Sequence, residues 1–332
     1  MSSVPTVTVV VPTRDRVELL EDTVRTVLSQ RDIDLAVVVV DDGSQEVAAA
    51  AIRRLSSSRL TVLRNPTSRG VASARNQGAD HATSRWVAFC DDDDLWTPNK
   101  LAGQVAAAAG AGATWAYTGA VKFAVGPVVW QVMPPPPPEV VRAQLADRNL
   151  IPAGASNVLV ERAAFQAVGG FDEELAHLAD WDLWLRLLEA GPPAATSDLG
   201  VAYRLHPGAM SLNPAGILEE LEVIDQRWRH LRDGRPLDPA PTHLWIAMSW
   251  LRAGRRLPAA RSYLRAVPSR PRPALRGVLR TLHPAPPRPA HVTAVAEQSN
   301  PRFKRVEHVD LPPTMNSLLD EFAAGPSPVV PQ

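Results

Sequence analysis

Apolar residues in the first hundred positions follow two alternating spacings. Short apolar or β-branched runs, typical of strands covered on both faces, occupy residues 6–12, 35–40, 60–63 and 86–90. Between these runs the apolar residues recur at helical spacing, as at Leu20, Val24 and Val27. Strand and helix in regular alternation predict a parallel sheet with right-handed crossovers.

Three polar clusters follow strands of this predicted sheet. PTRDR at residues 12–16 follows the first strand, DDGS at 41–44 follows the second, and four consecutive carboxylates, Asp91 to Asp94, follow the fourth. The carboxyl ends of parallel strands lie at one edge of a sheet, and ligands bind there. We therefore expect the three clusters to share one site.

The four carboxylates have two interpretations. They can form a solvated turn in which Asp94 caps the following helix. They can also bind a divalent cation, because hard oxygen ligands turn mutual repulsion into coordination. The stretch alone does not decide between the two.

Two further positions suit a nucleotide. Asp42 can accept a hydrogen bond from a ribose hydroxyl or a base N–H, and Gly43 permits the tight turn beside it. A helix is predicted over residues 70–82, and Arg75 lies in its first two turns, where phosphate or a base edge binds well. The structural alternative for Arg75 is an ion pair with Asp80 or Asp91.

The later part of the chain divides into three predicted regions. The α/β domain continues to residue 225, with strands over 115–123, 128–133, 156–160 and 201–205 and a helix over 180–190. Residues 226–283 form an Arg-rich helical region, with a helix–turn–helix over 243–267. Residues 284–332 are rich in proline, and we expect this tail to be largely disordered.

Composition excludes several classes. Lys+Arg and Asp+Glu both number 35, so no global basic field indicates nucleic acid. A single cysteine, Cys90, excludes an internal disulfide and a cysteine-cluster metal site, and it favours a reducing, cytoplasmic compartment. The amino terminus lacks the pattern of a signal peptide, and no apolar run approaches the roughly 18 residues that span a bilayer.

Seven motifs in register resemble family 2 glycosyltransferases over roughly residues 5–215. They are VTVVVPTRDRVELLEDTVRTVLSQ, VVVVDDGS, NPTSRGVASARNQG, FCDDDDLWTPNKL, GGFDEEL, ADWDLWLRL and YRLHPGAMS. The resemblance implies the GT-A fold, a Rossmann-like, mostly parallel sheet flanked by helices. It also implies sugar transfer from a nucleoside diphosphate sugar, UDP-sugar being favoured, to an acceptor hydroxyl by metal-assisted, inverting single displacement.

The resemblance also implies roles for individual residues. Asp180 matches the catalytic base, and Mn²⁺ or Mg²⁺ would be held by Asp93, Asp91 and His206. The positions that match nucleotide contacts are Pro12, Thr13, Arg14, Asp42, Arg75 and Asp92. Two positions depart from the family pattern, since Arg14 replaces the usual aromatic residue and Ala179 replaces a common Glu.

Other interpretations stay open beside this one. Asp180 can be a helix N-cap, and His206 can be structural. A nucleotidyltransferase would need a Gly-rich loop after the first strand, which PTRDR lacks, and a non-catalytic scaffold would not need Asp93 and Asp180. Ten arginines over residues 252–288 suit either a peripheral contact with an anionic membrane, at its inner face, or the protein's own acidic surface.

Overall fold

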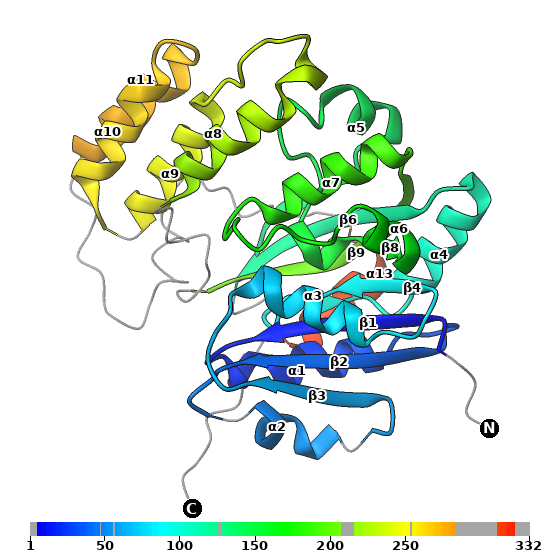
Figure 1. The fold of residues 1–332 in the computed structure, drawn as a ribbon. Coiled ribbons are helices and arrows are strands. Elements are labelled where there is room, and N and C mark those ends of the chain that lie inside the picture. Colours follow the sequence, from blue (N-terminus) through cyan, green and yellow to red (C-terminus); the bar gives the residue numbers. More distant parts are fainter. Residues whose placement is uncertain are drawn as a thin grey trace, which may run out of the picture. The chain divides into compact units, whose positions relative to one another are not determined.

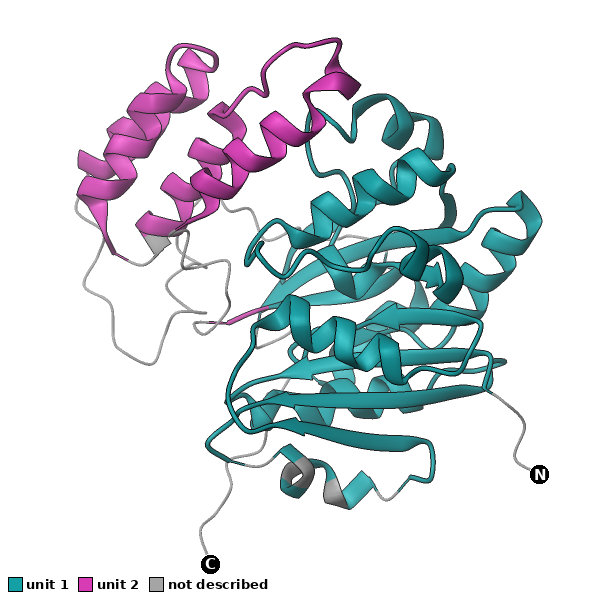
Figure 2. Cartoon of the chain, in the orientation of Figure 1, with its two compact units in different colours: residues 1–204, 304–332 teal, residues 205–303 magenta. Residues whose placement is uncertain are grey.

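Two compact units make up the computed structural model (Figure 2). Unit 1 comprises Met1–Arg204 and Lys304–Gln332, and unit 2 comprises Leu205–Phe303. The structure describes residues 5–46, 48–55, 57–124, 128–206, 216–252, 254–282 and 311–322. The division falls earlier than the boundary predicted at residue 225, because the helix after residue 216 groups with the C-terminal helices.

Unit 1 is built on a sheet whose strands lie in the order β3-β2-β1-β4-β8-β6-β9-β5, with β7 paired to β6 (Figure 1). The strands are β1 (Val7–Thr13), β2 (Leu35–Asp42), β3 (Leu60–Asn65), β4 (Trp86–Phe89), β5 (Leu95–Trp96), β6 (Trp115–Ala124), β7 (Val128–Met133), β8 (Leu159–Glu161) and β9 (Ala194–Leu205). The first four strands in sequence pair in parallel, as predicted. From β4 to β8 and onward to β6 and β7 the pairing is antiparallel, so the parallel part is one half of the sheet.

Helices cover both faces of the parallel half, which confirms the predicted α/β class. Those of unit 1 are α1 (Val17–Leu28), α2 (Ala48–Ala51), α3 (Val71–His81), α4 (Lys100–Ala111), α5 (Pro138–Gln144), α6 (Arg162–Ala167), α7 (Ala179–Ala190) and α13 (Pro313–Glu321), with 3₁₀ turns η1 (Ile52–Leu55) and η2 (Gly154–Asn157). On one face, Leu20 and Val24 of α1 share a core cluster with Val9. On the other face, α3 packs on β1 at Val10. Burial on both sides explains why these strands read as unbroken apolar runs.

Helix α13 lies within the tail that we predicted to be disordered. Leu311, Met315, Leu318, Leu319 and Phe322 are buried against Leu95, Val121 and Phe123 of the sheet. These apolar residues follow helical spacing, but proline-rich flanks on both sides hide the pattern in the sequence. The segment is ordered because the sheet offers it an apolar surface.

Unit 2 contains α8 (Ile217–Trp228), η4 (Arg229–Arg232), α9 (Ala240–Arg252), α10 (Arg256–Ala266) and α11 (Pro271–Leu282). The predicted helix–turn–helix corresponds to α9 and α10, which turn at Gly254 with a φ of 76°. Helix α11 was not predicted, and it packs on α10 where Gly277 meets the ring of Tyr263. Within the described parts of the chain, no helix combines the length and apolar composition needed to cross a membrane.

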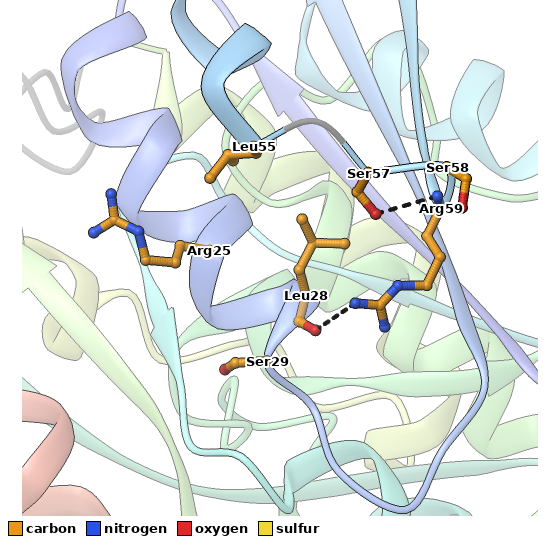
Figure 3. Close-up of a pocket in the computed structure, with 7 residues that line it drawn as sticks. All are labelled: Arg25, Leu28, Ser29, Leu55, Ser57, Ser58 and Arg59. Atoms are coloured by element: carbon orange, nitrogen blue, oxygen red, sulfur yellow. Dashed lines mark hydrogen bonds between the residues drawn. The ribbon is translucent and has the colours of Figure 1, made fainter.

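A shallow hollow in unit 1 lies at the amino ends of the strands (Figure 3). It is lined by Arg25 and Leu28 of α1, by Leu55, and by Arg59 just before β3. The Arg59 guanidinium donates a hydrogen bond to the Leu28 carbonyl across it. Neither an acidic residue nor a histidine lines this hollow, and none of the predicted site residues lies in it.

The contact between α3 and β1 gives a stability prediction. A Cβ added at Gly78 would lie 2.3 Å from Cγ1 of the buried Val10. We expect Gly78→Ala to lower the free energy of unfolding by about 1–3 kcal/mol, measured by urea denaturation, since the helix must shift off the sheet.

The matched control is Gly110→Ala in α4, where no atom outside the helix's own backbone and the neighbouring residues lies within 4 Å of the new Cβ. That substitution should raise stability by about 0.5–1 kcal/mol through helix propensity. Equal stability of the two variants would show that the close approach at Gly78 is not required.

Candidate functional site

The carboxyl ends of β1, β2 and β4 meet at one edge of the sheet, as the sequence predicted. Thr13 at the end of β1 is in register with Asp41 of β2. Its hydroxyl donates a 2.6 Å hydrogen bond to Oδ2 of Asp92, which follows β4. The first and fourth strands are therefore tied together at the point where the acidic cluster begins.

Arg16 neutralises part of that cluster from within the chain. One nitrogen of its guanidinium, Nη1, lies 3.0 Å from Oδ1 of Asp92 and 2.7 Å from Oδ2 of Asp93. Both carboxylates belong to buried residues. Burial raises the pKa of Asp92 to about 7, with Asp93 adding to the effect and Arg16 opposing it. The guanidinium of Arg16 thus lies between the carboxylates of Asp92 and Asp93.

Asp91 faces a second arginine. It forms a short ion pair with Arg75 of α3, whose guanidinium also lies 5.2 Å from the ring centroid of Phe171. The backbone N–H of Asp91 donates to the Ser156 hydroxyl at 2.9 Å. The ion pair with Asp91, one of the two alternatives for Arg75, is therefore present, and Arg75 is only 6% exposed.

Asp94 is fully buried. Its Oδ1 accepts the backbone N–H of Arg204 at 3.1 Å, and its carbonyl accepts the hydroxyl of Thr23. Burial raises the pKa of Asp94 well above its usual value. These contacts tie the loop after β4 to β9 and α1, which is a structural role.

Asp42 holds the loop that precedes α3. Its two carboxylate oxygens accept hydrogen bonds from the Asn65 amide, the Ser68 hydroxyl and the backbone N–H groups of Arg69 and Gly70. Burial alone raises the pKa of Asp42, but these hydrogen bonds outweigh it and hold the pKa below its usual value. The predicted nucleotide contact of Asp42 stays a prediction.

Asp180 lies in the first turn of α7 rather than at its N-cap, which is Leu178. Its Oδ1 accepts the backbone N–H of Trp181 at 2.6 Å, and its Oδ2 lies 3.4 Å from the Asn149 amide. The side chain is partly buried, and burial raises the pKa of Asp180 to about 6 although Arg75 nearby lowers it. A carboxylate with this pKa can accept a proton near neutral pH.

The environment of the neighbouring Asp182 differs from that of Asp180. It is fully buried and pairs with Arg186 one turn later, at 2.8 Å. Arg186 in turn donates to the Gly170 carbonyl at 2.6 Å. Asp182 therefore anchors α7 to the loop after α6.

The remaining predicted site residues lie as follows. Pro12 is buried within β1, whereas the Arg14 side chain is 60% exposed and contacts Asp15. His206 directly follows β9 and belongs to unit 2, so its metal role stays a prediction. Among the described residues, no group of three or more acidic, histidine or cysteine side chains converges on one point.

Three residues of the site were not singled out from the sequence. Arg16 lies inside the quoted PTRDR, and a basic residue just past a strand end beside an acidic cluster was the available signal. Asn149 and Ser156 carried no signal, because they are distant in sequence from Asp180 and Asp91. Only the folded chain brings these pairs together.

Two family profiles match the chain. The profile of Glycosyl transferase family 2 matches residues 8–169, and that of Glycosyltransferase like family 2 matches residues 139–226. Together they cover the β1–β9 region that carries the acidic cluster and Asp180.

Curated relatives include two enzymes of Escherichia coli. One is the UDP-Glc:alpha-D-GlcNAc-diphosphoundecaprenol beta-1,3-glucosyltransferase WfaP, 28% identical over 194 residues, which span 58% of this chain and 74% of WfaP. The other carries the same description as WfgD and is 31% identical over 99 residues, 30% of this chain and 39% of WfgD.

Solved structures share the fold. Staphylococcus aureus TarS 1-349 in complex with UDP-GlcNAc gives a TM-score of 0.55 at 16% identity, covering 83% of this chain and 89% of that chain. The mannosyltransferase PcManGT from Pyrobaculum calidifontis, in complex with GDP-Man and Mn²⁺, gives 0.50 at 20% identity, covering 85% and 82%.

The position of Arg16 yields a prediction about cation binding. We expect Arg16→Gln to bind Mn²⁺ at least roughly tenfold more tightly than the wild type, because a divalent ion then displaces no charged hydrogen bonds. Isothermal titration of the nucleotide-free protein measures the dissociation constant directly. Arg14→Gln, two residues away and exposed, is the control and should bind like the wild type. Equal affinities of all three proteins would show that Arg16 does not compete with the ion.

Proposed function

The chain belongs to glycosyltransferase family 2 and has the GT-A fold, and from this we propose that it transfers a sugar from a UDP-sugar to a hydroxyl of a lipid-linked acceptor. The observation that carries the proposal is the cluster of side chains at the carboxyl edge of the sheet. Carboxylate oxygens of Asp92 and Asp93 lie within 3.0 Å of the same Arg16 nitrogen, and Arg75 pairs with Asp91 and lowers the pKa of Asp180. Glycosyl transfer itself follows from the family. A nucleotidyltransferase and a non-catalytic scaffold are therefore not favoured.

The donor and acceptor classes rest on the curated relatives. WfaP is described as using UDP-Glc and a diphosphoundecaprenol-linked sugar. We propose that the nucleotide of the donor contacts Pro12, Thr13, Arg14, Asp42, Arg75 and Asp92. A guanidinium plane at Arg14 can stack on a base where the family usually has an aromatic ring.

The residues present fit a divalent cation. Mg²⁺ is usually held by one or two carboxylates together with phosphate oxygens and water. Asp92 and Asp93 supply two converging carboxylates, and the guanidinium of Arg16 stands in for a cation between them. We propose that Asp93, Asp91 and His206 would hold Mn²⁺ or Mg²⁺, which when bound would neutralise charge on the leaving diphosphate.

Asp180 is the proposed base. Its carboxylate takes the proton of the acceptor hydroxyl, whose oxygen attacks the anomeric carbon while the bond from that carbon to the diphosphate breaks. A single displacement of this kind inverts the anomeric configuration and needs no covalent nucleophile. The pKa of about 6 leaves Asp180 mostly ionised at neutral pH while keeping it basic enough to accept a proton.

A thermal-shift panel tests the donor site. UDP, GDP, dTDP and CDP are each added with and without Mn²⁺ to the wild type, to Asp93→Asn and to Asp80→Asn, an exposed control on α3. We expect UDP with Mn²⁺ to raise the melting temperature of the wild type and the control but not of Asp93→Asn. Ligand at a hundred times its dissociation constant stabilises by about 2.7 kcal/mol, a readable shift. Absence of any nucleotide shift would contradict the proposed donor site.

Replacing Asp180 should affect catalysis but not nucleotide binding. Asp180→Asn should lower kcat by roughly 10²–10⁴ and keep the UDP thermal shift, because the base does not bind the nucleotide. In the wild type, kcat/KM should fall as the pH drops through about 6, since the base must be deprotonated. A pH profile without this acidic limb would exclude Asp180 as the base.

The stability of the fold should depend on pH in the direction opposite to kcat/KM. The folded-state pKa of Asp180 lies above its unfolded value near 3.9, so folding disfavours the charged form and stability falls as the pH rises through about 6. Asp180→Asn should therefore be more stable than the wild type by roughly 1–2 kcal/mol at pH 8, and the difference should vanish near pH 4. Urea denaturation at the two pH values measures both.

A further inference from the structure

The outer faces of α10 and α11 in unit 2 carry exposed leucines in regular rows. Single exposed apolar side chains are ordinary on protein surfaces, but a row on one helix is not. The exposed fractions are 76% for Leu257 and 55% for Leu264 on α10, and 51%, 58% and 71% for Leu275, Leu279 and Leu282 on α11. Five leucines on two consecutive helices, each more than half exposed, need a physical explanation.

Helix α11 has three distinct rows of side chains. Ala274, Gly277 and Thr281 form its buried row, and Gly277 packs on Tyr263 of α10. The exposed leucines at positions 275, 279 and 282 follow the i, i+4, i+7 spacing of a single stripe. The exposed arginines at 272, 276 and 280 follow i, i+4, i+8, roughly 90° further round the helix at 100° per residue.

Helix α10 repeats the arrangement. Its buried row includes Ala259 and Ala266, seven residues apart, and the exposed Leu257 and Leu264 are also seven apart on the opposite side. Exposed Arg261 lies between these leucines on the same face. Each helix therefore presents leucine and arginine together to solvent.

The charge of this surface is unbalanced. The sequence contains no acidic residue between Asp238 and Glu297. Asp238 lies 3.5 Å from Arg270, the residue that precedes α11. Among the residues that the structure describes, no carboxylate lies within ion-pair distance of the arginine row at 272, 276 and 280. Arginines that have no carboxylate partner among the described residues, and that lie beside exposed leucines, suit an anionic partner that also accepts apolar side chains.

We propose that this face, defined by Leu257, Leu264, Leu275, Leu279 and Leu282 with Arg261, Arg272, Arg276 and Arg280, docks on an anionic lipid bilayer. The leucines enter the boundary between headgroups and acyl chains, and the guanidinium groups contact lipid phosphates. Apolar residues that stand out from helices insert into a bilayer, whereas a folded protein partner would need a matching groove. The inference goes beyond the proposed reaction, since it depends on neither the donor nor the base.

Vesicle flotation of the full-length chain tests the proposal. The vesicles are either phosphatidylcholine alone or a mixture with 30–40% phosphatidylglycerol, roughly the anionic share that gives a strong surface potential. Three triple variants are compared: Leu275→Gln/Leu279→Gln/Leu282→Gln, Arg272→Gln/Arg276→Gln/Arg280→Gln, and the control Arg31→Gln/Arg54→Gln/Arg85→Gln. The control removes the same charge from exposed positions of unit 1.

The wild type and the control should bind the anionic vesicles and not the neutral ones. The arginine variant should bind on the order of a hundredfold more weakly, because each interfacial arginine contributes about 1 kcal/mol. The leucine variant should lose binding even at low salt, since charge alone gives weak, salt-sensitive attraction. All substituted positions are exposed, so circular dichroism and the UDP thermal shift should be unchanged in every variant.

Other outcomes overturn the proposal. Binding of either variant at the level of the control would show that this face does not contact lipid, and so would equal binding to neutral and anionic vesicles. A wild type that ignores vesicles but forms a dimer, which the leucine variant does not form, would assign the face to self-association instead. Since the UDP shift is measured on the same samples, failure of the donor site would be recognised separately.

Discussion

Mutual repulsion among the carboxylates that follow β4 is the constraint around which the site is arranged. Asp92, Asp93 and Asp94 are buried residues, and their charges interact more strongly there than they would in water. The chain itself supplies cations to these groups, Arg16 to Asp92 and Asp93 and Arg75 to Asp91. The proposed donor and divalent ion would have to compete with these ion pairs.

Arg75 couples two parts of the site that lie far apart in sequence. It pairs with Asp91, rests against Phe171 and lowers the pKa of Asp180. Asp91 and Arg75 both act on the pKa of Asp180, so the charge of this pair sets part of the electrostatic environment of the proposed base. Burial raises the pKa of Asp180 and outweighs the effect of Arg75. The result is a carboxyl group that is harder to ionise than an exposed one and can accept a proton near neutral pH. Such a conflict between stability and chemistry is expected at a functional site.

The two units divide the surface chemistry between them. Unit 1 brings the carboxylates that follow β2 and β4 to one edge of its sheet, whereas the sequence of α9 to α11 in unit 2 carries arginine and no acidic residue. A lipid-linked acceptor combines a membrane-bound tail with a soluble sugar. The proposed diphosphate site and the proposed bilayer contact would therefore use different surfaces.

The sequence by itself determined the parallel half of the sheet, the family and the edge at which the polar clusters meet. Apolar runs such as 35–40 followed at once by Asp41 and Asp42 are local patterns, and local patterns are what a sequence displays. Tertiary structure alone decided that Arg16 lies between Asp92 and Asp93, that Asn149 reaches Asp180, and that residues 311–322 form a helix. Each of these depends on segments distant in sequence, and burial, which sets the pKa of Asp180, exists only once those segments pack together.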